Sequence, residues 1–499
     1  MIKTQLRCHQ LFYARVSIRS FTLKSKNQYI LPKDYVPNKK NLKNISLQEG
    51  LKIWWDSLSP NRLESLQNEL VKLMIPNNEE NTNIELIQRR IPIQQGDHIN
   101  TVTICRKNSK LPTKHVVFIH GYGASLGCFA RNFKIIDELK ESDKFNYHIH
   151  FLDNITFGLS SNPKIDNDKI SWKIPPTAKI KLIDNEPTDP KKLYRKYYKL
   201  IEGYQLDPEN FEEYQKYFGP ILEDMELFYT KAIDGWRKSM GLEKIDYLIG
   251  HSFGAYWCGS YSIKFPNNVS NLILLSPVGL ERHVMAITNT DKITNEIEKP
   301  NLDPTSYKFL TRFPILSKNH ILNWYYKIPY LPKILKLLGP FGVQYYFSMW
   351  LSKLGKINKL IAKHGGAQEI FQNSNDLVIG SSKEIKLIIE YLYNSITNGT
   401  NSDIYVKYLL TPATVSKVPL MDKFLQADPQ TFKFNTFIFY GQYDFMNSEA
   451  GKKMIDILHK NNPKSIFEYD EIAEGGHNLY IDNPFDTNKK IGKIIIDQE

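Results

Sequence analysis

The sequence predicts a doubly wound α/β fold, in which helices cover both faces of a mostly parallel sheet. Short apolar runs, such as HVVFIHG, HIHFLDN, IDYLIGHS, LILLSP and FNTFIFYG, are typical of strands buried on both faces. Helical spacing occurs between them, as in residues 220–241, where Ile221, Met225, Phe228 and Ala232 fall on one stripe. Strands that alternate with helices in this way form a parallel sheet.

The 499 residues leave room for one large fold with insertions or for several domains. The strand-like runs begin at about residue 90, and a long helical stretch separates LILLSP from FNTFIFYG. An insertion at that place would form a cap or lid over the carboxyl edge of the sheet. We therefore expect a basic leader (1–33), an N-terminal helical extension (34–90), a first core part (91–279), a helical cap (280–425) and a second core part (426–499).

The formal net charge of +12 comes from two acid-free segments. Residues 1–33 contribute +7 and residues 304–368 contribute +10, so the rest of the chain is slightly acidic. A protein that binds nucleic acid through its overall charge is therefore not expected. The four cysteines show neither metal-ligand nor disulfide-framework spacing, which indicates a reducing compartment.

The leader has the composition of a mitochondrial transit peptide. Arg7, Arg15 and Arg19 are interspersed with apolar residues, and no acid occurs before Asp34. It lacks the apolar run of a secretory signal, and the alternative is a basic N-terminus with no targeting role. Because no run of 18 or more apolar residues occurs in the chain, we expect any membrane contact to be peripheral.

The motif Gly250-His251-Ser252-Phe253-Gly254 follows the apolar run IDYLI and precedes a helix-like stretch. In this context, G-x-S-x-G predicts a nucleophile elbow, a strained turn that lifts the serine hydroxyl above the sheet. In isolation the same pentapeptide could be an ordinary glycine turn. The strand before it and the helix after it favour the elbow.

A serine nucleophile needs a base, and the base needs an orienting acid. Asp444 follows the run FNTFIFY, and His477 follows the last strand-like run in Glu474-Gly475-Gly476-His477. The order Ser252, Asp444, His477 is one that catalytic triads use on this kind of sheet. Three other acids compete for the orienting role but follow a strand less directly: Asp422, Asp470 and Asp482.

Two backbone N–H groups are expected to bind the oxyanion that forms during the reaction. Phe253, directly after the nucleophile, should supply one of them. The turn His120-Gly121-Tyr122-Gly123 should supply the other, with Tyr122 as first choice and Gly123 as second. This chemistry requires neither a metal nor an organic cofactor.

His477 and Asp482 also form an H-x-x-x-x-D spacing, which is associated with glycerolipid acyltransferases. Asp482 could equally cap or salt-link the last helix. Hydrolysis and acyl transfer differ only in whether water or a lysolipid hydroxyl attacks the acyl-enzyme. The spacing therefore does not distinguish the two reactions.

The acid-free segment 304–368 combines lysines with many aromatic and aliphatic residues. Four of these lysines recur at helical spacing among leucines and isoleucines. Such a face suits anionic phospholipid headgroups. The alternative is a solvated lid over a buried core, which would explain the apolar residues but not the absence of acids. The predicted membrane-binding lysines are Lys353, Lys356, Lys359 and Lys363.

Five stretches of the chain, HGYGASLGCF, DNITFGLSSNP, residues 236–280, YGQYDFM and GGHNLYIDNP, together resemble one α/β-hydrolase subfamily. This subfamily contains lipase coactivators and N-acyl-phospholipid hydrolases, and the match covers residues 90–290 and 405–495. The resemblance implies an α/β-hydrolase fold with a mostly parallel sheet and serine esterase chemistry. Some members lack the serine and act only as lipase coactivators, but Ser252 is present here.

With its transit-like leader, the chain is similar to a fungal mitochondrial branch of cardiolipin-specific deacylases. That resemblance implies phospholipase A-type removal of one acyl chain from cardiolipin, which gives monolysocardiolipin for acyl-chain remodelling. The expected partners are a phospholipid substrate and the anionic surface of the inner membrane, on its matrix side. Two alternatives stay open: an acyl-CoA-dependent lysophospholipid acyltransferase, and a non-catalytic protein that recruits another lipase.

Overall fold

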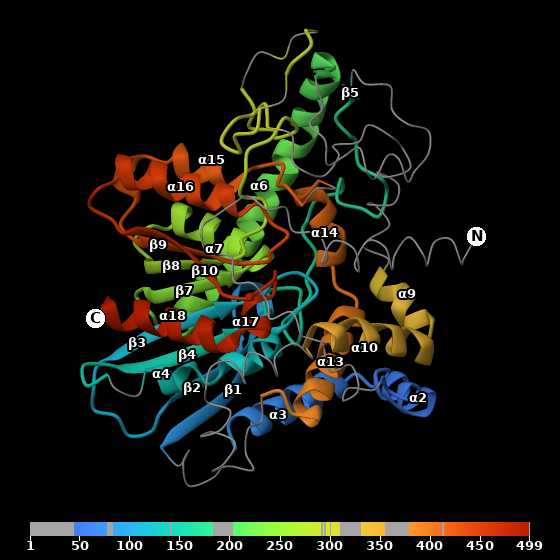
Figure 1. The fold of residues 1–499 in the computed structure, drawn as a ribbon, viewed down its shortest axis with the longest axis vertical. Coiled ribbons are helices and arrows are strands. Elements are labelled where there is room, and N and C mark those ends of the chain that lie inside the picture. Colours follow the sequence, from blue (N-terminus) through green and yellow to red (C-terminus); the bar gives the residue numbers. More distant parts are fainter. Residues whose placement is uncertain are drawn as a thin grey trace, which may run out of the picture.

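Figure 1 shows the computed structural model of the chain. It describes residues 44–76, 83–139, 142–182, 203–290, 293, 296–299, 301–309, 331–354, 379–411 and 414–498. The expected leader 1–33 and the lysines Lys356, Lys359 and Lys363 lie outside the described residues. Within the described ranges, no helix has both the length and the apolar character needed to cross a bilayer.

An eight-stranded, mostly parallel sheet forms the centre of the molecule, as predicted. In spatial order its strands are β1 (Ile84–Pro92), β2 (His98–Arg106), β4 (Asn146–Leu152), β3 (Thr113–Ile119), β7 (Ile245–His251), β8 (Val269–Leu275), β9 (Asn435–Gly441) and β10 (Phe467–Ile472). The β1–β2 and β2–β4 pairs are antiparallel, and the other pairs are parallel. The carboxyl ends of β3, β7 and β9 therefore meet at one edge.

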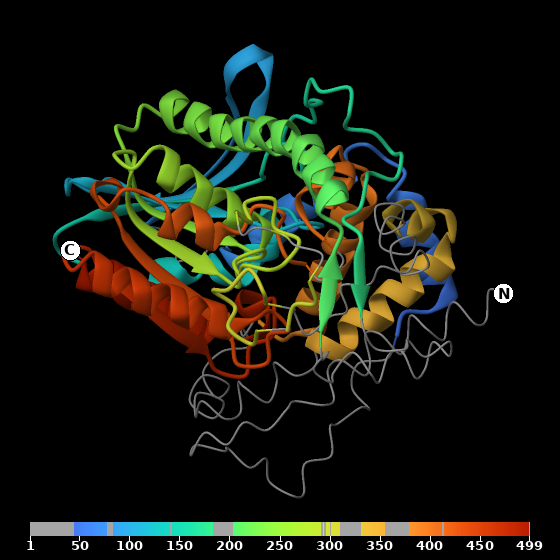
Figure 2. The ribbon, with the colours of Figure 1, turned by 90° about the horizontal axis from the view of Figure 1, so that it is seen from above.

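Helices cover both faces of this sheet, and each face has its own apolar core. Successive strand residues point to opposite faces, so Val117 and Ile119 join one core while Val116 and Phe118 join the other. Figure 2 shows the long green helix α6 and the red helix α18 on opposite sides of the strands. The first face carries α6 (Pro208–Ser239), α7 (Phe253–Lys264), α15 (Leu420–Leu425) and α16 (Ser448–Asn461).

The second face carries α3 (Arg62–Met74), η3 (Leu126–Asn132), α4 (Ile135–Glu138), α17 (Leu479–Asp482) and α18 (Pro484–Asp497). Smaller elements complete the described core. A two-stranded antiparallel ribbon, β5 (Ile180–Leu182) with β6 (Tyr204–Leu206), precedes α6. Two short 3-10 helices are η2 (Gln94–Gly96) and η5 (Pro429–Thr431).

Helix α6 begins earlier than the predicted stretch 220–241. Asp207 caps it by accepting a hydrogen bond from the N–H of Asn210 (3.2 Å), and Pro208 occupies its first position. The apolar stripe faces the sheet as expected, since Ile221 and Met225 are fully buried. Pro220, which would mark a helix start in the sequence, lies inside the helix instead.

The N-terminal extension contains two helices but ends sooner than predicted. Helix α2 (Leu47–Asp56) starts with a capping box, in which the N–H of Glu49 donates to Ser46 and the N–H of Ser46 donates to Glu49. Helix α3 follows it. Strand β1 then begins at Ile84, so the expected boundary at residue 90 is wrong and residues 84–90 belong to the sheet.

The described part of the predicted cap segment 280–425 contains helices that pack against other parts of the chain. Helices α9 (Leu331–Leu337), α10 (Pro340–Leu354) and α13 (Ser382–Thr397) gather beside α2 and α3 (Figure 1). The indole N–H of Trp54 in α2 donates to the Lys336 carbonyl in α9 (2.9 Å). Helix α14 (Ser402–Leu409) packs against α6, and α15 packs against α7 and α16, so both contribute to the first core. The expected cap boundary at 425 is therefore too late.

A buried ion pair fastens the cap to the core. Arg131 in η3 donates two hydrogen bonds to Glu384 in α13 (2.7 and 3.0 Å), and both side chains are fully buried. Arg131 also donates to the carbonyl of Ile481 in α17 (2.7 Å). Three elements far apart in the sequence are thus connected through one guanidinium group.

We expect Arg131→Met to lower the free energy of unfolding by about 3–5 kcal/mol, because Glu384 would stay buried without its cation. The double variant Arg131→Met with Glu384→Leu should recover much of that loss, since no uncompensated charge remains. Arg90→Met is the control, because the Arg90–Glu64 pair is about half exposed and should contribute less than about 1 kcal/mol. Urea unfolding followed by circular dichroism measures all three; equal losses for Arg131→Met and Arg90→Met would contradict this assignment.

Candidate active site

Ser252 occupies a strained turn between β7 and α7. Its backbone has φ 50° and ψ −111°, a conformation that residues with side chains rarely adopt. Such strain persists where the surrounding structure fixes the backbone. Here the N–H of Ser252 donates to the carbonyl of Leu275 at the end of β8 (2.9 Å). The strand-to-helix turn expected from G-x-S-x-G is therefore present.

The two motif glycines make this turn possible. A Cβ on Gly250 would lie 2.6 Å from the Cα of Ala255, and a Cβ on Gly254 would lie 2.7 Å from the carbonyl oxygen of Ile119. Both neighbours are backbone atoms that cannot rotate away. Glycine at these positions lets α7 begin directly against the ends of β7 and β3.

A hydrogen-bonded chain joins the three residues that the sequence predicted. His477 Nε2 lies 3.0 Å from Ser252 Oγ, and His477 Nδ1 lies 3.2 Å from Asp444 Oδ1. Because the carboxylate accepts the Nδ1 proton, Nε2 is left to accept the serine proton. Asp444 is buried, whereas 18% of the His477 side chain is exposed. The arrangement is that of a nucleophile, a base and an orienting acid.

Two of the competing acids are engaged elsewhere. Asp422 is buried and binds Arg282, and it also accepts a hydrogen bond from the hydroxyl of Tyr307 (2.8 Å). Asp470 is exposed and pairs with Lys490 (2.8 Å). The acid that contacts the base is therefore the one that directly follows β9.

Asp482, the third competitor, holds the turn that carries the base. Its Oδ2 accepts the N–H of Gly476 (2.9 Å), the residue just before His477. The H-x-x-x-x-D spacing thus has a structural explanation in this chain. The acyltransferase interpretation of that spacing stays a prediction.

The electrostatic surroundings suit a base that becomes positively charged during the reaction. Burial of Asp444 acts to raise its pKa, but its contacts with His477, Ser276 and the N–H of Met446 together outweigh burial and lower the pKa below the ordinary value. Burial lowers the pKa of His251 to about 3, so that its ring is neutral and donates from Nε2 to the His477 carbonyl (2.9 Å). A neutral His251 does not repel the imidazolium of His477. No sequence pattern marked His251, which occupies an unspecified position of the G-x-S-x-G motif.

The predicted oxyanion-binding turn lies directly against the nucleophile. A Cβ on Gly121 would lie 3.0 Å from the Cβ of Ser252, and Gly123 has φ 69°. Phe253 opens α7, where the first N–H groups have no acceptor within the helix. The structure therefore brings both expected donor segments to Ser252, and the choice between Tyr122 and Gly123 stays a prediction.

A buried carboxylate, Asp153, supports this turn and was missed in the sequence. It accepts hydrogen bonds from the side chain of Asn100 (2.7 Å) and from the N–H groups of Leu126 (2.6 Å) and Leu159 (2.7 Å). Burial raises its pKa to about 6, and these three donors act in the opposite direction. Its position directly after β4, within Asp153-Asn-Ile-Thr, was the available sequence signal.

His120 completes the support of the turn. Its Nε2 accepts the N–H of Asn154 (3.0 Å), so Nδ1 carries the proton and donates to the Gly121 carbonyl (2.8 Å). Burial lowers the pKa of His120 to about 4, which keeps the ring neutral. The loops after β3 and β4 are therefore fixed to each other.

Helix α14 of the cap is connected to the same turn. The hydroxyl of Tyr122 donates to Asp403 (2.9 Å), and burial raises the pKa of Asp403 to about 6. The neighbouring Ser402 shares hydrogen bonds with the hydroxyls of Tyr229 (2.7 Å) and Thr156. A side chain from the oxyanion-binding turn thus contacts the cap, which no sequence pattern indicated.

Exposed aromatic residues flank the orienting acid. Tyr443 is 61% exposed and Phe445 is 47% exposed, and the Phe445 ring lies 4.7 Å from the His477 ring between centroids. Apolar groups at this place give the base a partly apolar rim. Such a rim is compatible with an acyl chain as part of the substrate.

Comparison with known proteins agrees with this architecture. A model of the α/β-hydrolase fold family matches residues 114–319, which contain the elbow and the oxyanion-binding turn. The chain has the α/β-hydrolase fold. Among curated relatives, the Saccharomyces cerevisiae protein ECM18 is 27% identical over 471 residues, covering 91% of this chain and 86% of that protein.

Two further relatives have names that describe an activity. The Saccharomyces cerevisiae 1-acylglycerol-3-phosphate O-acyltransferase ICT1 is 26% identical over 378 residues, covering 74% of this chain and 78% of that protein. The Sus scrofa 1-acylglycerol-3-phosphate O-acyltransferase ABHD5 is 22% identical over 405 residues, covering 81% and 83%. These names support the resemblance to lipid-acting α/β hydrolases. They do not specify a cardiolipin deacylase.

We expect a fluorophosphonate probe to label the wild-type protein and not Ser252→Ala, because the probe reacts with a serine whose proton a neighbouring base removes. His477→Ala should reduce labelling by about a hundredfold or more. Ser59→Ala, at an exposed serine between α2 and α3, is the matched control and should label normally. In-gel fluorescence measures the extent of labelling, and unchanged labelling of Ser252→Ala would exclude Ser252 as the nucleophile.

Proposed function

We propose that this α/β hydrolase is a serine-dependent phospholipid deacylase and that cardiolipin is its substrate. The observation that carries the proposal is the hydrogen-bonded chain from Ser252 through His477 to Asp444. Names of relatives that act on glycerolipids support a lipid substrate. Cardiolipin itself rests on the resemblance stated for the sequence and on the basic segments of the chain.

The reaction proceeds in two steps at this site. Ser252 Oγ attacks the ester carbonyl carbon while His477 takes its proton, and the N–H groups of Phe253 and Tyr122 stabilise the oxyanion. His477 then gives the proton to the departing lysolipid oxygen, which leaves an acyl-enzyme. Water attacks that ester in the second step and releases a fatty acid. Asp444 keeps Nε2 of His477 directed at the serine throughout.

A mitochondrial location, on the matrix side of the inner membrane, is part of the same proposal. The acid-free segment 1–33 supports it by composition. Cardiolipin carries two phosphates, and the second basic segment, 304–368, offers cations for them. Lys353, the predicted headgroup ligand that lies among the described residues, is exposed on α10.

Acyl transfer is the second candidate, because relatives are named acyltransferases. In that case a lysophospholipid hydroxyl replaces water in the second step, and acyl-CoA supplies the acyl group in the first. A recruiting protein without catalysis is less favoured, because such a role requires neither Ser252 nor its contact with His477. These alternatives predict different products when the protein is incubated with phospholipid vesicles and, separately, with acyl-CoA and a lysophospholipid.

We expect mass spectrometry to find monolysocardiolipin and free fatty acid after the purified protein is incubated with vesicles of cardiolipin, phosphatidylethanolamine and phosphatidylcholine in equal amounts. Ser252→Ala should give neither product, and its unfolding temperature should be unchanged because the hydroxyl contributes little packing. Ser59→Ala serves as the active control. If lyso-products form from the other lipids instead, the protein is still a phospholipid deacylase, but cardiolipin is not its specific substrate.

A parallel incubation with acyl-CoA and lysophosphatidic acid tests the transferase alternative. Phosphatidic acid formed faster than free fatty acid would favour acyl transfer over hydrolysis. If neither incubation gives a product but the protein still reacts with the fluorophosphonate probe, its substrate is none of these lipids.

The side lobe of α2, α9 and α10 supports membrane contact. Large apolar side chains are exposed on and directly after α2 and α9 and at the start of α10, and we call this set the apolar lobe surface. So many exposed apolar side chains in one region do not contribute to a buried core. Large exposed apolar patches are typical of interaction sites. The set comprises Leu47, Leu51, Trp55, Leu58, Ile334, Leu337, Leu338 and Phe341.

We expect the triple variant Trp55→Ser, Leu337→Ser and Phe341→Ser to bind cardiolipin-containing vesicles about tenfold or more weakly, because each side chain would insert into the lipid interface. Folding should be unaffected, since these side chains are 67%, 84% and 64% exposed.

The control for this variant changes three apolar residues outside the lobe that are also more than half exposed: Ile174→Ser, Ile297→Ser and Leu302→Ser. Vesicle sedimentation measures binding, and the rate of hydrolysis of a soluble short-chain ester shows whether the active site is intact. Equal binding by the two triple variants would contradict the apolar lobe surface without affecting the proposed catalytic residues.

A further inference from the structure

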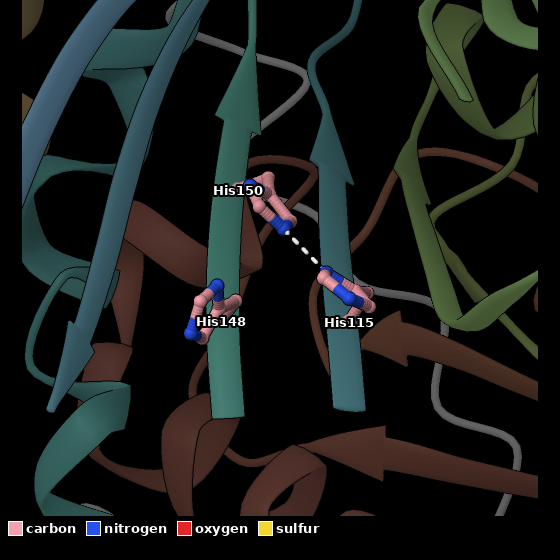
Figure 3. A group of neighbouring side chains, drawn as sticks. All are labelled: His115, His148 and His150. Atoms are coloured by element: carbon pink, nitrogen blue, oxygen red, sulfur yellow. Dashed lines mark hydrogen bonds between the residues drawn. The ribbon is translucent and has the colours of Figure 1, made fainter. Parts of the chain in front are cut away.

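Three histidines cluster at the sheet, away from the candidate active site. His115 lies on β3, and His148 and His150 lie on the neighbouring strand β4 (Figure 3). Each offers one ring nitrogen that lies within 4.8 Å of the others. Within the described ranges, this is the one group of potential metal ligands of that compactness.

The pairing of β3 with β4 produces the cluster. His115 is the register partner of His148, and His150 follows two residues later on the same face of β4. The Nδ1 atom of His115 lies 3.0 Å from Nε2 of His150, as the dashed line in Figure 3 marks. Two nitrogens bound to one tetrahedral zinc ion lie about 3.3 Å apart, since each Zn–N bond is about 2.0–2.1 Å. This pair needs only a small movement of the rings, whereas the His148 nitrogen, which lies within 4.8 Å of the other two, can need a larger one.

A neighbouring side chain fixes the orientation of one imidazole. The hydroxyl of Thr103 on β2 lies 2.9 Å from Nδ1 of His150, which leaves Nε2 directed toward His115. Metal-bound histidines usually have such a partner on their second nitrogen. The ring of Trp236 from α6 covers His150 on this face, with 5.3 Å between ring centroids. His150 is therefore fully buried, while His115 and His148 stay partly accessible.

We propose that His115, His148 and His150 form a binding site for a divalent transition-metal ion of the zinc class. Three neutral imidazoles are a set that zinc and its neighbours in the first transition row prefer, and a fourth position would be open to water. The ion would join two adjacent strands near their amino ends.

The protein can bind the ion at this site without releasing a proton. In the metal-free state, one of the two facing nitrogens, Nδ1 of His115 and Nε2 of His150, donates its proton to the other. When the ion takes both lone pairs, that proton moves to the second nitrogen of its own ring. The histidines stay neutral, and the bound ion adds its full positive charge.

The site is separate from the proposed chemistry. From His115, strand β3 runs toward Gly121, which touches Ser252, over a span on the order of 15–20 Å at about 3.3 Å per residue. The ion would therefore stabilise the sheet and take no part in ester cleavage. The competing explanation is a core of hydrogen-bonded imidazoles with no ligand.

The test uses full-length protein from which metal has been removed with a chelator. After incubation with zinc and desalting, elemental analysis should find one zinc ion per chain. Cobalt should give the intense visible absorption of a site with few ligands, and X-ray absorption of the zinc form should count three imidazole ligands. Zinc should also raise the unfolding temperature.

His115→Gln and His148→Ala should each weaken zinc binding about tenfold or more, because each removes one of three ligands. His459→Ala, at an exposed histidine of α16, is the matched control and should bind zinc normally. Circular dichroism verifies that the variants are folded. If they are not, the ligand count in the wild-type zinc form decides.

Less than a tenth of an equivalent of zinc in the wild type would overturn the proposal. So would fewer than three imidazole ligands, or equal zinc affinity of His148→Ala and His459→Ala. Fluorophosphonate labelling of Ser252 should be the same with and without zinc, so failure of the metal site is distinguishable from failure of the deacylase.

Discussion

The close approach of α7 to the ends of β3 and β7 is the constraint on which the site depends. Gly254 admits the Ile119 carbonyl and Gly250 admits the backbone of Ala255, so the helix can start directly against both strands. The residue between them, Ser252, must then adopt φ 50°. Its side chain projects from the carboxyl edge, where the loops after β9 and β10 supply Asp444 and His477. The strained backbone and the placement of the nucleophile have the same cause.

Around this turn, buried polar groups replace the apolar packing found elsewhere in the core. Asp153 and His120 bind backbone N–H and carbonyl groups of the loops after β3 and β4, so these loops lack the freedom of an exposed turn. Because each of these bonds is buried, breaking one leaves an unsatisfied group at a cost of about 1–3 kcal/mol. Rigidity at this place has a chemical value, since oxyanion donors stabilise charge best when they need no reorganisation. The Tyr122–Asp403 bond extends that rigid network into the cap.

The parallel strands and the triad could be predicted from the sequence because each leaves a local pattern. Continuous apolar runs such as the one in IDYLIGHS predict strands that are buried on both faces. The order Ser252, Asp444, His477 along the chain is the order in which α/β hydrolases place their triad residues. Features that depend on distant contacts left no such pattern. Strand β1 lies at the sheet edge and has neither a continuous apolar run nor a regular alternation, so its residues 84–90 were assigned to the helical extension. The contact of Asp403 with Tyr122 joins residues 281 positions apart. The cysteines show no zinc-ligand spacing, and the pair His148 and His150 is too short a pattern to indicate a site. The third histidine, His115, joins them only when β3 pairs with β4.

The two ends of β3 and β4 differ in a way that follows from strand polarity. At the carboxyl ends, the chain leaves the sheet in loops that aim backbone N–H groups and side chains at the nucleophile. Near the amino ends, side chains such as His115 and His148 face each other across the ladder at a spacing that the hydrogen bonds fix. A fixed loop can aim unpaired backbone N–H groups at a substrate, whereas a ladder uses its N–H groups between strands and holds its side chains at nearly constant separation. Stabilisation of an oxyanion by backbone donors therefore fits the first end, and the proposed ion, with its fixed ligand geometry, fits the second.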